Sequence, residues 1–416
     1  MKVAGVIAEF DPFHNGHAYF LRRVRELTSA DFIVAVMSGD FTQRGNTAVM
    51  GKRLRARAAM KNGADIVIEL PVQYSTASAE VFALGGVSVL NALGCVDCLC
   101  FGTENDDIEA LSSAADILSR ESDGFRESLD DNLRSGMSFP AARMKALRDT
   151  GCGGDMEELL CRPNNILAVE YIKALKSLDS MIKPLCIKRA AVDHDSSNTY
   201  GIYSSAKNIR QTLRLTGTFD SVERYLPENT LTFLRECFSV VFPLYDDDLS
   251  LLMKYRLLTE SAYSLMKYAD MNADLAKRMI NKRHEFRDVS RFTELIKTRN
   301  LTYTRISRAM LHVLLDITRD DMKLYRDAGT TGYARVLGFN KEASALLDEI
   351  NEKASVPVIS RLSEHKKSPV YPFDKMLSGT LRASDIYISV IEDVYGTEVT
   401  PDLSNMAVCE DGFVIF

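Results

Sequence analysis

Short apolar runs alternate with helix-period stretches over the first 215 residues of the chain. The apolar runs, which we predict to be strands, lie at 3–10, 31–39, 64–71, 96–102 and 181–189. Apolar residues at three- and four-residue spacing predict helices between them, at 16–28, 51–62, 76–93, 107–120 and 164–178. Buried strands separated by helices indicate a parallel sheet covered on both faces. Such a sheet binds its ligand outside the carboxyl ends of its strands.

The pattern changes near residue 216. From there to about 328 the chain has helix periodicity and few strand signals, as in SLLMKYRLLTESAYSLMKYA. The rest contains two strand-like segments, GYARVLGFN and VPVISRL, and a last helix signal, ASDIYISVIEDVYG. We therefore predict an α/β protein in three units. Residues 1–215 form a Rossmann-like parallel-sheet domain, 216–328 a helical domain, and 329–416 a small C-terminal α/β region.

Charge is distributed unevenly along the 416 residues. The chain has a net charge of −6, but residues 277–308 hold ten Lys or Arg against Glu285, Asp288 and Glu294, a local charge of +7. A basic segment in an acidic protein is typical of a polyanion-binding surface, although a charge run is more often a solvated helical face. With Tyr303 and Phe286 among the arginines, we favour an RNA-binding surface that reads the backbone.

Neither the cysteines nor the apolar segments indicate a metal site or a membrane protein. Cys95, Cys98 and Cys100 form a CxxC-like cluster, but no second ligand pair follows, so we interpret all eight cysteines as reduced thiols. No segment approaches the ~20 apolar residues that span a bilayer, and the N-terminal apolar run is too short for a secretion signal. We expect a cytoplasmic protein and make no prediction of its oligomeric state.

HNGH, residues 14–17, stands where the first predicted strand passes into a helix. The first turn of a helix favours anions, because its backbone N–H groups are unpaired and its dipole is positive there. His14 and His17 can donate hydrogen bonds to phosphate oxygens at that point, and Gly16 would let a nucleotide approach the backbone. Such donors stabilise charge that develops on an α-phosphate under attack. The alternative is a pair of capping or core histidines; the strand, the Asp-Pro turn and Gly16 favour the phosphate site.

HNGH resembles the HxGH motif of the nucleotidylyltransferase superfamily, and the longer string EFDPFHNGH resembles a narrower family. Together with MSGDFTQRG, GADIVIELP, FGTEND, PNNILAVEY, IKR, SAKNIR and RNLTYTRISRAMLHVLLDI, in this order, it resembles the bacterial tRNA(Met) cytidine acetate ligases. Two positions depart from the family pattern. Asp11 stands where Asn is usual, a small change because both residues suit a turn, and Arg162 precedes PNN where a small residue is commoner.

The resemblance implies an ATP site that spans 7–20 and is completed after later strands. The implied contacts are Ile7, Ala8, Glu9, Phe10, Asp11, Pro12, Phe13, His14, Asn15, Gly16, His17, Ala18, Tyr19, Phe20, Gly102, Asn164, Asn165, Lys188, Arg189, Ser205, Lys207 and Arg210. Asn164 or Asn165 suits an adenine or ribose edge, but one of them could simply cap a helix. Ser204 and Ser205 would hold phosphates in the superfamily's second motif, with Lys207 and Arg210 adding charge.

Asp40, Gln43 and Arg44 follow the second strand, and Lys52 and Arg55 open the next helix. Asp40, Gln43 and Arg44 could bind substrate or order the loop. The alternative is that all five belong to a solvated loop and helix face, and the sequence does not decide between the two. Mg²⁺ on the pyrophosphate is chemically reasonable, yet no carboxylate cluster marks a metal site.

The function that these observations predict is an ATP-dependent acetate ligase. Acetate would attack the α-phosphate to give acetyl-adenylate and pyrophosphate, with His14 and His17 as the catalytic residues. The acetyl group would then pass to a tRNA cytidine; the resemblance alone identifies this as the wobble cytidine of elongator methionine tRNA, giving N4-acetylcytidine. The alternatives are a small-molecule adenylyltransferase or carboxylate–amine ligase of the same superfamily, and a non-catalytic RNA-binding protein with a relic nucleotide site.

Overall fold

The fold is given by a computed structural model that describes residues 1–104, 106–120, 122–137, 139–151, 154–189, 201–362, 369–404, 407–410 and 412–416. All five predicted N-terminal strands are present. They are β1 (Val3–Ala8), β2 (Phe32–Ser38), β3 (Ile66–Leu70), β4 (Cys98–Thr103) and β5 (Lys183–Lys188). They pair in parallel in the order β5-β4-β1-β2-β3. This is the doubly wound order, and its switch point lies between β1 and β4.

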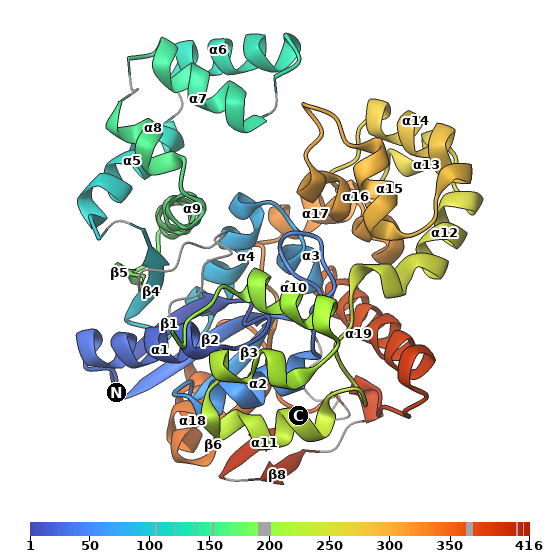
Figure 1. Cartoon of the computed structure of the whole chain (residues 1–416). Helices are drawn as coiled ribbons and strands as arrows, with labels where there is room; N and C mark the ends of the chain where they lie inside the picture. The colour runs from blue at the N-terminus through green and yellow to red at the C-terminus, as the bar shows by residue number, and fades with distance from the viewer. Residues whose placement is uncertain are drawn as a thin grey trace.

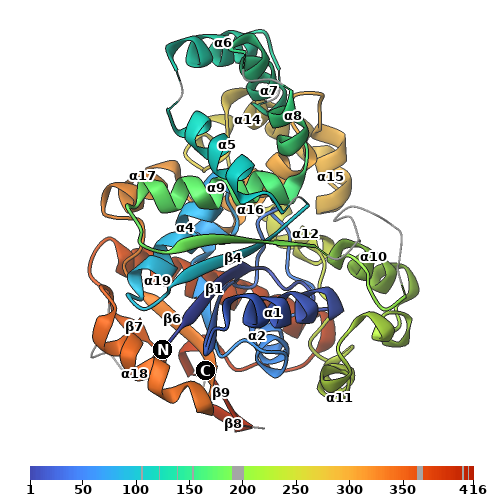
Figure 2. The same cartoon turned by 90° about the vertical axis from the view of Figure 1, so that its left-hand side faces the viewer.

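Helices cover both faces of this sheet, as Figures 1 and 2 show. One face packs against α1 (Asn15–Thr28), α2 (Lys52–Lys61), α10 (Ala206–Thr216) and α11 (Glu228–Cys237). The other packs against α4 (Ala79–Ala92), α5 (Ile108–Arg120) and α9 (Pro163–Ser177), with the short α3 (Val72–Ser75) ahead of α4. Buried strands between two helical layers explain the nearly continuous apolar runs of the sequence.

The C-terminal region joins the same sheet. Its strand β6 (Ala334–Asn340) pairs antiparallel with β3, and β7 (Val358–Ile359), β8 (Val408–Glu410) and β9 (Phe413–Ile415) follow β6. The described residues thus form one nine-stranded sheet. The helices of this region are α18 (Ser344–Lys353) and α19 (Phe373–Tyr395). The hydrogen-bonded sheet therefore runs from the first unit into the C-terminal region. β6 supplies the hydrogen-bond partners for the backbone groups at the edge of β3.

The helical region packs around a second core, which it shares with α19 and with Phe41 of the loop after β2. Its helices are α12 (Ser250–Thr259), α13 (Ala262–Leu265), α14 (Ala273–Lys282), α15 (Val289–Ile296), α16 (Tyr303–Leu315) and α17 (Arg319–Asp327), with 3-10 turns η3 (Asp246–Leu249) and η4 (Arg283–Glu285). In the helical region that core begins near Leu244. Phe219, Phe233 and Phe242 belong instead to the core under α1 and α2, as do the turns η1 (Phe219–Ser221) and η2 (Glu223–Tyr225). The boundary between the two hydrophobic cores therefore lies later in the chain than residue 216, where the pattern of apolar residues changes.

Three helices between α5 and α9 form a lobe that the sequence analysis did not assign. They are α6 (Asp123–Arg134), α7 (Phe139–Asp149) and α8 (Asp155–Leu160). Figure 1 shows α6 and α7 away from the sheet, on the same side of it as the helical region. The turn after α6 approaches the loop between α15 and α16, since a Cβ on Gly136 would lie 3.4 Å from Asn300 Nδ2.

A buried network of charges joins the C-terminal segment to the sheet. Lys52 Nζ lies 2.8 Å from Glu69 Oε1 and 2.6 Å from Asp402 Oδ2, which is in the turn η7 (Asp402–Ser404). Arg335 on β6 contacts the same two carboxylates at 2.6 and 2.9 Å. Lys52, Glu69, Arg335 and Asp402 are all buried, so each charge depends on its partners for the solvation it has lost.

None of the helices in the described ranges is long and apolar enough to cross a bilayer.

Candidate active site

The two histidines of HNGH cap the first turn of α1. His14 is the N-cap residue, and its Nδ1 accepts a hydrogen bond of 3.0 Å from the Gly16 N–H. The His14 N–H in turn donates to Nδ1 of His17, at 3.3 Å. An imidazole whose Nδ1 accepts carries its proton on Nε2 when neutral. The capping interaction therefore makes Nε2–H the donor of both rings, at the positive end of a helix.

The two imidazole rings are stacked and walled by phenylalanines. The His14 and His17 ring centroids are 3.7 Å apart at an interplanar angle of 21°. Phe10 lies edge-on to His17 at 5.0 Å, and Phe13 lies 5.6 Å from the same ring. Phe10 has a φ of +51°, a conformation that side-chain-bearing residues adopt at a cost. We infer that the chain tolerates this backbone strain because it places the Phe10 ring against His17.

The His14 ring leaves no room for a side chain at residue 16, so this position needs glycine. A Cβ at this position would lie 2.8 Å from His14 Cε1 and 3.0 Å from its Nδ1, closer than packed atoms approach. The sequence analysis assigned Gly16 to close approach of a nucleotide; the structure adds the His14 ring as a reason for glycine.

The Gly16→Ala variant tests this constraint. The added methyl group should displace the His14 ring and break its hydrogen bond to the residue 16 N–H. We expect ATP turnover to fall at least about tenfold while the thermal unfolding temperature changes little, because the helix gains a better helix former. Turnover assays and circular dichroism melts would check this; full activity in the Gly16→Ala variant would show that the ring position is unimportant.

A loop after β2 holds the carboxylates that precede the histidines. The Gln43 N–H donates to Glu9 Oε1 and the Val49 N–H to Asp11 Oδ1, each at 2.7 Å. Burial raises the pKa of the Glu9 carboxyl above its usual value, although the Gln43 N–H opposes the shift. The Asp11 carboxylate also lies 3.4 Å from Arg210 Nη1.

The second motif packs directly onto the first. Ser205 caps α10 by accepting from the Asn208 N–H, and the Asn208 side chain donates to Ser204. Arg210 also donates to the Asp11 carbonyl. Asn15 Nδ2 donates to the Ile202 carbonyl at 3.0 Å. HNGH and SAKNIR, separated by nearly two hundred residues, therefore form one surface, on which Lys207 is exposed.

Gly102, Asn164 and Arg189 meet on the other side of the switch point. The Arg189 guanidinium approaches the Asn164 side-chain oxygen at 3.5 Å, and a Cβ on Gly102 would contact the Arg189 side chain at 3.2 Å. Burial lowers the pKa of Arg189, and the Glu104 carboxylate opposes that shift. Glu104 accepts from the N–H groups of Asn164 and Asn165 and caps α9 with its negative charge.

Asn165 and Lys188 do not share the contacts that join Gly102, Asn164 and Arg189. Asn165 has no exposed surface, and its amide is used by the Glu104 N–H and the Leu159 carbonyl. It therefore acts on the site through Glu104, a residue that the sequence analysis assigned no role. Lys188 is exposed, and its Nζ lies 3.9 Å from Asp106.

The remaining predicted contacts belong to β1 and α1. Ile7 and Ala8 end β1, Pro12 lies in the turn before His14, and Ala18, Tyr19 and Phe20 continue α1; all but the buried Pro12 are partly exposed.

Asp40 of the loop after β2 and Arg55 of α2 have structural contacts. Asp40 accepts from the Lys52 N–H at 2.9 Å, and Arg55 is fully buried and donates to the Glu9 and Ser38 carbonyls. These contacts, with Asp40, Lys52 and Arg55 all buried, fit an ordered loop and not the alternative of a solvated loop and helix face. Gln43 also orders it, through Glu9 and through the Ala77 carbonyl. Arg55 fixes the carboxyl ends of β1 and β2, where the site lies.

The same loop reaches the helical region, which the sequence could not show. The Thr47 N–H donates to Asp246 Oδ1 at 2.7 Å, and burial raises the pKa of Asp246 to about 6. Gly45, with φ of +77°, fits against the backbone of Ser307 and Arg308 on α16 so closely that a Cβ would overlap it. One loop therefore contacts both the carboxylates beside HNGH and the helices of the basic segment.

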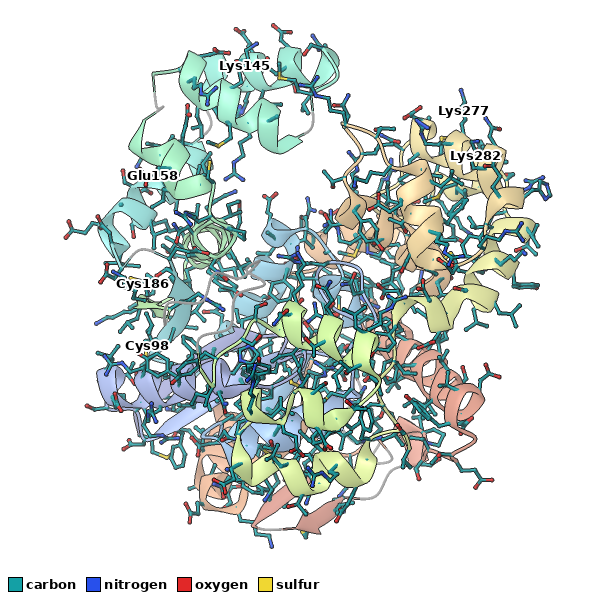
Figure 3. All side chains as sticks on the ribbon, in the orientation of Figure 1. Cys98, Lys145, Glu158, Cys186, Lys277 and Lys282 are labelled. Atoms are coloured by element: carbon teal, nitrogen blue, oxygen red, sulfur yellow. The ribbon has the colours of Figure 1, made fainter. Side chains whose placement is uncertain are left out.

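The basic segment 277–308 is exposed in part. Lys277, Arg287 and Arg299 are exposed, and Figure 3 shows Lys277 and Lys282 at the outer edge of the helical region. Several other charges have acidic partners, such as Lys282 with Glu285 and Arg308 with Asp270. The prediction that Phe286 lies on an RNA surface is wrong: it is 1% exposed, because it packs in the helical core against Phe292. Tyr303 is half-buried.

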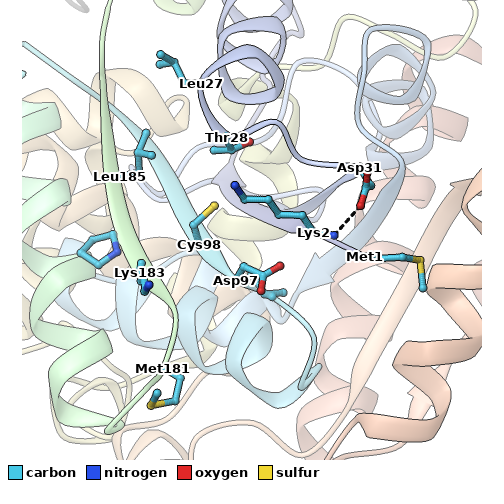
Figure 4. Close-up of a pocket in the computed structure, with 12 residues that line it drawn as sticks. Met1, Lys2, Leu27, Thr28, Asp31, Asp97, Cys98, Met181, Lys183 and Leu185 are labelled. Atoms are coloured by element: carbon cyan, nitrogen blue, oxygen red, sulfur yellow. Dashed lines mark hydrogen bonds between the residues drawn. The ribbon is translucent and has the colours of Figure 1, made fainter.

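A hollow of about 650 Å³ lies at the opposite end of the strands and contains none of the predicted site residues. Figure 4 shows it beside Lys2, Asp97 and Lys183, which precede or begin β1, β4 and β5. Cys98 lines it, and Cys98 Sγ lies 4.0 Å from Cys100 Sγ. Both are free thiols. The described residues contain no group of three or more His, Cys, Asp or Glu side chains arranged for a metal ion; Cys152 lies outside them.

Comparisons with known proteins show which family the chain resembles in sequence and fold. Residues 1–400 match the family model described as HIGH Nucleotidyl Transferase. A tRNA(Met) cytidine acetate ligase of Acetivibrio thermocellus is 36% identical over 393 residues, covering 93% of this chain and 95% of its own. The enzyme of the same name from a Thermoanaerobacter species is also 36% identical, over 388 residues, with the same coverage.

Two crystal structures of Thermotoga maritima TmcAL share the fold. The apo form has a TM-score of 0.89 and the form bound with alpha-thio ATP 0.88. Both are 30% identical in sequence and cover 97% of this chain and 98% of their own.

Proposed function

The chain belongs to the HIGH nucleotidyl transferase family, among the tRNA(Met) cytidine acetate ligases, and from that premise we propose that it activates acetate with ATP and transfers the acetyl group to a tRNA cytidine. The observation that carries the proposal is the reciprocal cap of His14 and His17, which makes Nε2–H the donor of both rings at the first turn of α1. The acceptor proposed is the wobble cytidine of elongator methionine tRNA, which becomes N4-acetylcytidine.

In the first step an acetate oxygen attacks the α-phosphorus, and the bond to pyrophosphate breaks. Charge builds on the non-bridging oxygens, and the two imidazole N–H donors and the helix N-terminus stabilise it without forming a covalent intermediate. Stacking and the Phe10 and Phe13 walls hold His17 in place, so little reorganisation is needed during the reaction.

Phosphate groups would be held on both sides of the histidines. Arg210, Lys207 and the Ser205 turn lie on the α10 side and Arg189 on the β4 side, where the neighbouring Asn164 would contact the adenine or ribose. These assignments follow the ATP contacts that the resemblance implied. The described residues contain no cluster of side chains that could ligate Mg²⁺. Mg²⁺ would therefore enter the site bound to the phosphate oxygens of ATP.

In the second step the exocyclic amine of cytidine attacks the acetyl carbonyl carbon. The carbon–oxygen bond to AMP breaks, AMP leaves with the electron pair, and the amine loses a proton. A tRNA must therefore reach the end of β1 while its body rests elsewhere. The basic segment is the proposed resting surface. Because its substrate is tRNA, we expect the protein in the cytoplasm.

The proposal is tested by incubating a tRNA transcript with ATP and isotope-labelled acetate. Label is expected in N4-acetylcytidine at the wobble position of elongator methionine tRNA and absent from initiator tRNA. Label that requires a larger carboxylate or a small-molecule amine would instead favour the other ligases of the superfamily.

Reversing charges in the basic segment should weaken tRNA binding. Arg287→Glu and Arg299→Glu, both at exposed positions, are each expected to lower tRNA affinity about tenfold at low salt and to make the salt dependence less steep. Filter-binding titrations at several salt concentrations would measure this. Lys341→Glu, an exposed charge next to β6, is the matched control and should bind as the wild type does. Unchanged affinity in both test variants would contradict the assignment.

A further inference from the structure

The helix α12 is apolar on two opposite faces. Met253 and Leu257 point into the helical core and are 2% and 1% exposed. Leu251, Tyr255 and Leu258 follow one another at four- and three-residue spacing and so share the other face. Their exposed fractions are 79%, 64% and 50%. A surface helix normally keeps its outer face polar, so this second apolar face calls for a partner.

A further exposed aromatic residue follows in the next helix. Tyr263, which opens α13 with Ala262, is 83% exposed. We call Leu251, Tyr255, Leu258 and Tyr263 the α12 stripe. Exposed single apolar residues are ordinary; two leucines and a tyrosine on one face of a helix, followed by a second exposed tyrosine, form more than single exposed residues.

Charges of both signs flank the α12 stripe, and two of the acidic ones are paired, Asp247 of η3 with Arg214 and Glu285 of η4 with Lys282. Lys254 and Lys267 are exposed within and just beyond it, and α12 packs against η4, which carries Arg283 of the basic segment. The nearby Glu260 carboxylate is already engaged, since it accepts from Arg256 and from the Tyr268 hydroxyl. Because these acidic groups have partners, the exposed Lys254 and Lys267 favour a partner that is an anion with apolar surfaces.

An RNA satisfies both requirements, and a second copy of this chain does not. Unpaired nucleotides offer flat base faces that stack on tyrosine, while their phosphates pair with lysine and arginine. In a symmetric homodimer, by contrast, the same patch faces itself. Lys254 and Lys267 would then be brought against their own copies, which is unfavourable.

The position of α12 suits a substrate that also enters the active site. α12 begins at Ser250, directly after η3, whose Asp246 accepts from the loop that holds Glu9 and Asp11. Ser250 also receives the Val289 N–H from α15, so the start of α12 is tied to the basic segment. An RNA lying along α12 therefore approaches the same loop that borders HNGH.

We propose that the α12 stripe is a stacking surface for unpaired nucleotides of the tRNA outside the wobble position, with Tyr255 and Tyr263 as its two aromatic contacts. This inference rests on the proposed function, because it takes tRNA as the substrate. It adds to the charge-based surface a contact that salt does not screen.

The test is the binding of an unmodified elongator methionine tRNA transcript to single and double variants. Tyr255→Ala and Tyr263→Ala should each weaken binding about tenfold, with an unchanged slope of affinity against salt concentration. Tyr255→Phe and Tyr263→Phe should bind as the wild type does, because phenylalanine still stacks. Met181→Ala, which removes an apolar side chain that is 90% exposed at the far end of the sheet, is the matched control and should have no effect.

Three results would overturn the proposal: tRNA binding that is unchanged in the double alanine variant, affinity lost equally in the phenylalanine variants, or a wild-type dimer that the alanine substitutions dissociate. Acetate-dependent pyrophosphate exchange should stay at the wild-type rate in every variant. Wild-type protein that neither exchanges nor binds tRNA would refute the proposed function itself, and so the two failures are distinguishable.

Discussion

Replacing His17 with alanine is expected to lower the rate of acetate-dependent ATP–pyrophosphate exchange by about two to three orders of magnitude, the usual effect of removing one preorganised donor to a developing oxyanion. His17 is the more informative of the pair because it stabilises the fold less. Its Nδ1 accepts one backbone N–H, and its ring is half-buried between Phe10, Phe13 and His14. His14→Ala should reduce exchange similarly, with an added loss of about 1 kcal/mol of stability from the missing N-cap.

The matched control for this prediction is His284→Ala. His284 is an exposed histidine in η4, so its removal should leave exchange in the absence of tRNA unchanged. Exchange at near wild-type rates in the His17 variant would show that the imidazole does not contact the reacting phosphate. Circular dichroism would confirm that the variant is folded before the rates are compared.

Removing the Asp402 carboxylate is expected to destabilise the protein by about 3–5 kcal/mol, because it leaves buried cations without their shared partner. Asp402 lies 2.6 Å from both Lys52 and Arg53 and 2.9 Å from Arg335. Although burial alone would raise it, these cations hold the pKa of Asp402 well below its usual range. Urea unfolding of Asp402→Ala at neutral pH would measure the loss, with Asp393→Ala, an exposed aspartate on α19, as the matched control.

The pH dependence of the same carboxylate has a definite sign. A group whose pKa is lower in the folded state adds stability above its unfolded pKa, which is about 3.9 for aspartate. That contribution is lost as the pH falls below this value toward the lowered folded pKa. The stability difference between wild type and Asp402→Asn should therefore narrow below about pH 4. A difference that is small at pH 7, or that grows with acid, would show that the network is not what holds the C-terminal segment.

The sequence predicted where the strands and helices of the sheet lie in the chain better than it predicted which elements pair or pack together. The five parallel strands and the helices between them followed from apolar runs and helical periodicity, which depend on local burial. That β6 pairs with β3, and that 329–416 completes the first sheet, depends on contacts between residues far apart in the chain. The lobe α6–α8 was not assigned, although Phe125 and Leu129 of α6 stand at helical spacing and are buried. The core boundary near Leu244 is set by packing rather than by pattern.

In the candidate site, too, the sequence predicted local features but not the contacts between residues far apart in the chain. The positions of His14, His17, Gly102 and Arg189 at strand ends were predictable, because parallel strands gather their carboxyl ends at one edge. The roles of Glu104 and Asp246 were not, since they depend on which N–H groups each carboxylate meets. Arg210 was expected to bind phosphate, and the structure adds its contact with Asp11. Phe286 was misplaced because an aromatic residue among arginines looks the same in sequence whether it points outward or inward.

The central claim is that this chain makes an acetyl-adenylate with the two histidines of α1. The most direct measurement is the incorporation of labelled pyrophosphate into ATP with acetate present and tRNA absent. The account predicts exchange that requires acetate, falls by about two to three orders of magnitude in the His17→Ala variant and is unaffected in the His284→Ala variant. Exchange that is absent with acetate, or that persists at the wild-type rate without His17, would contradict it.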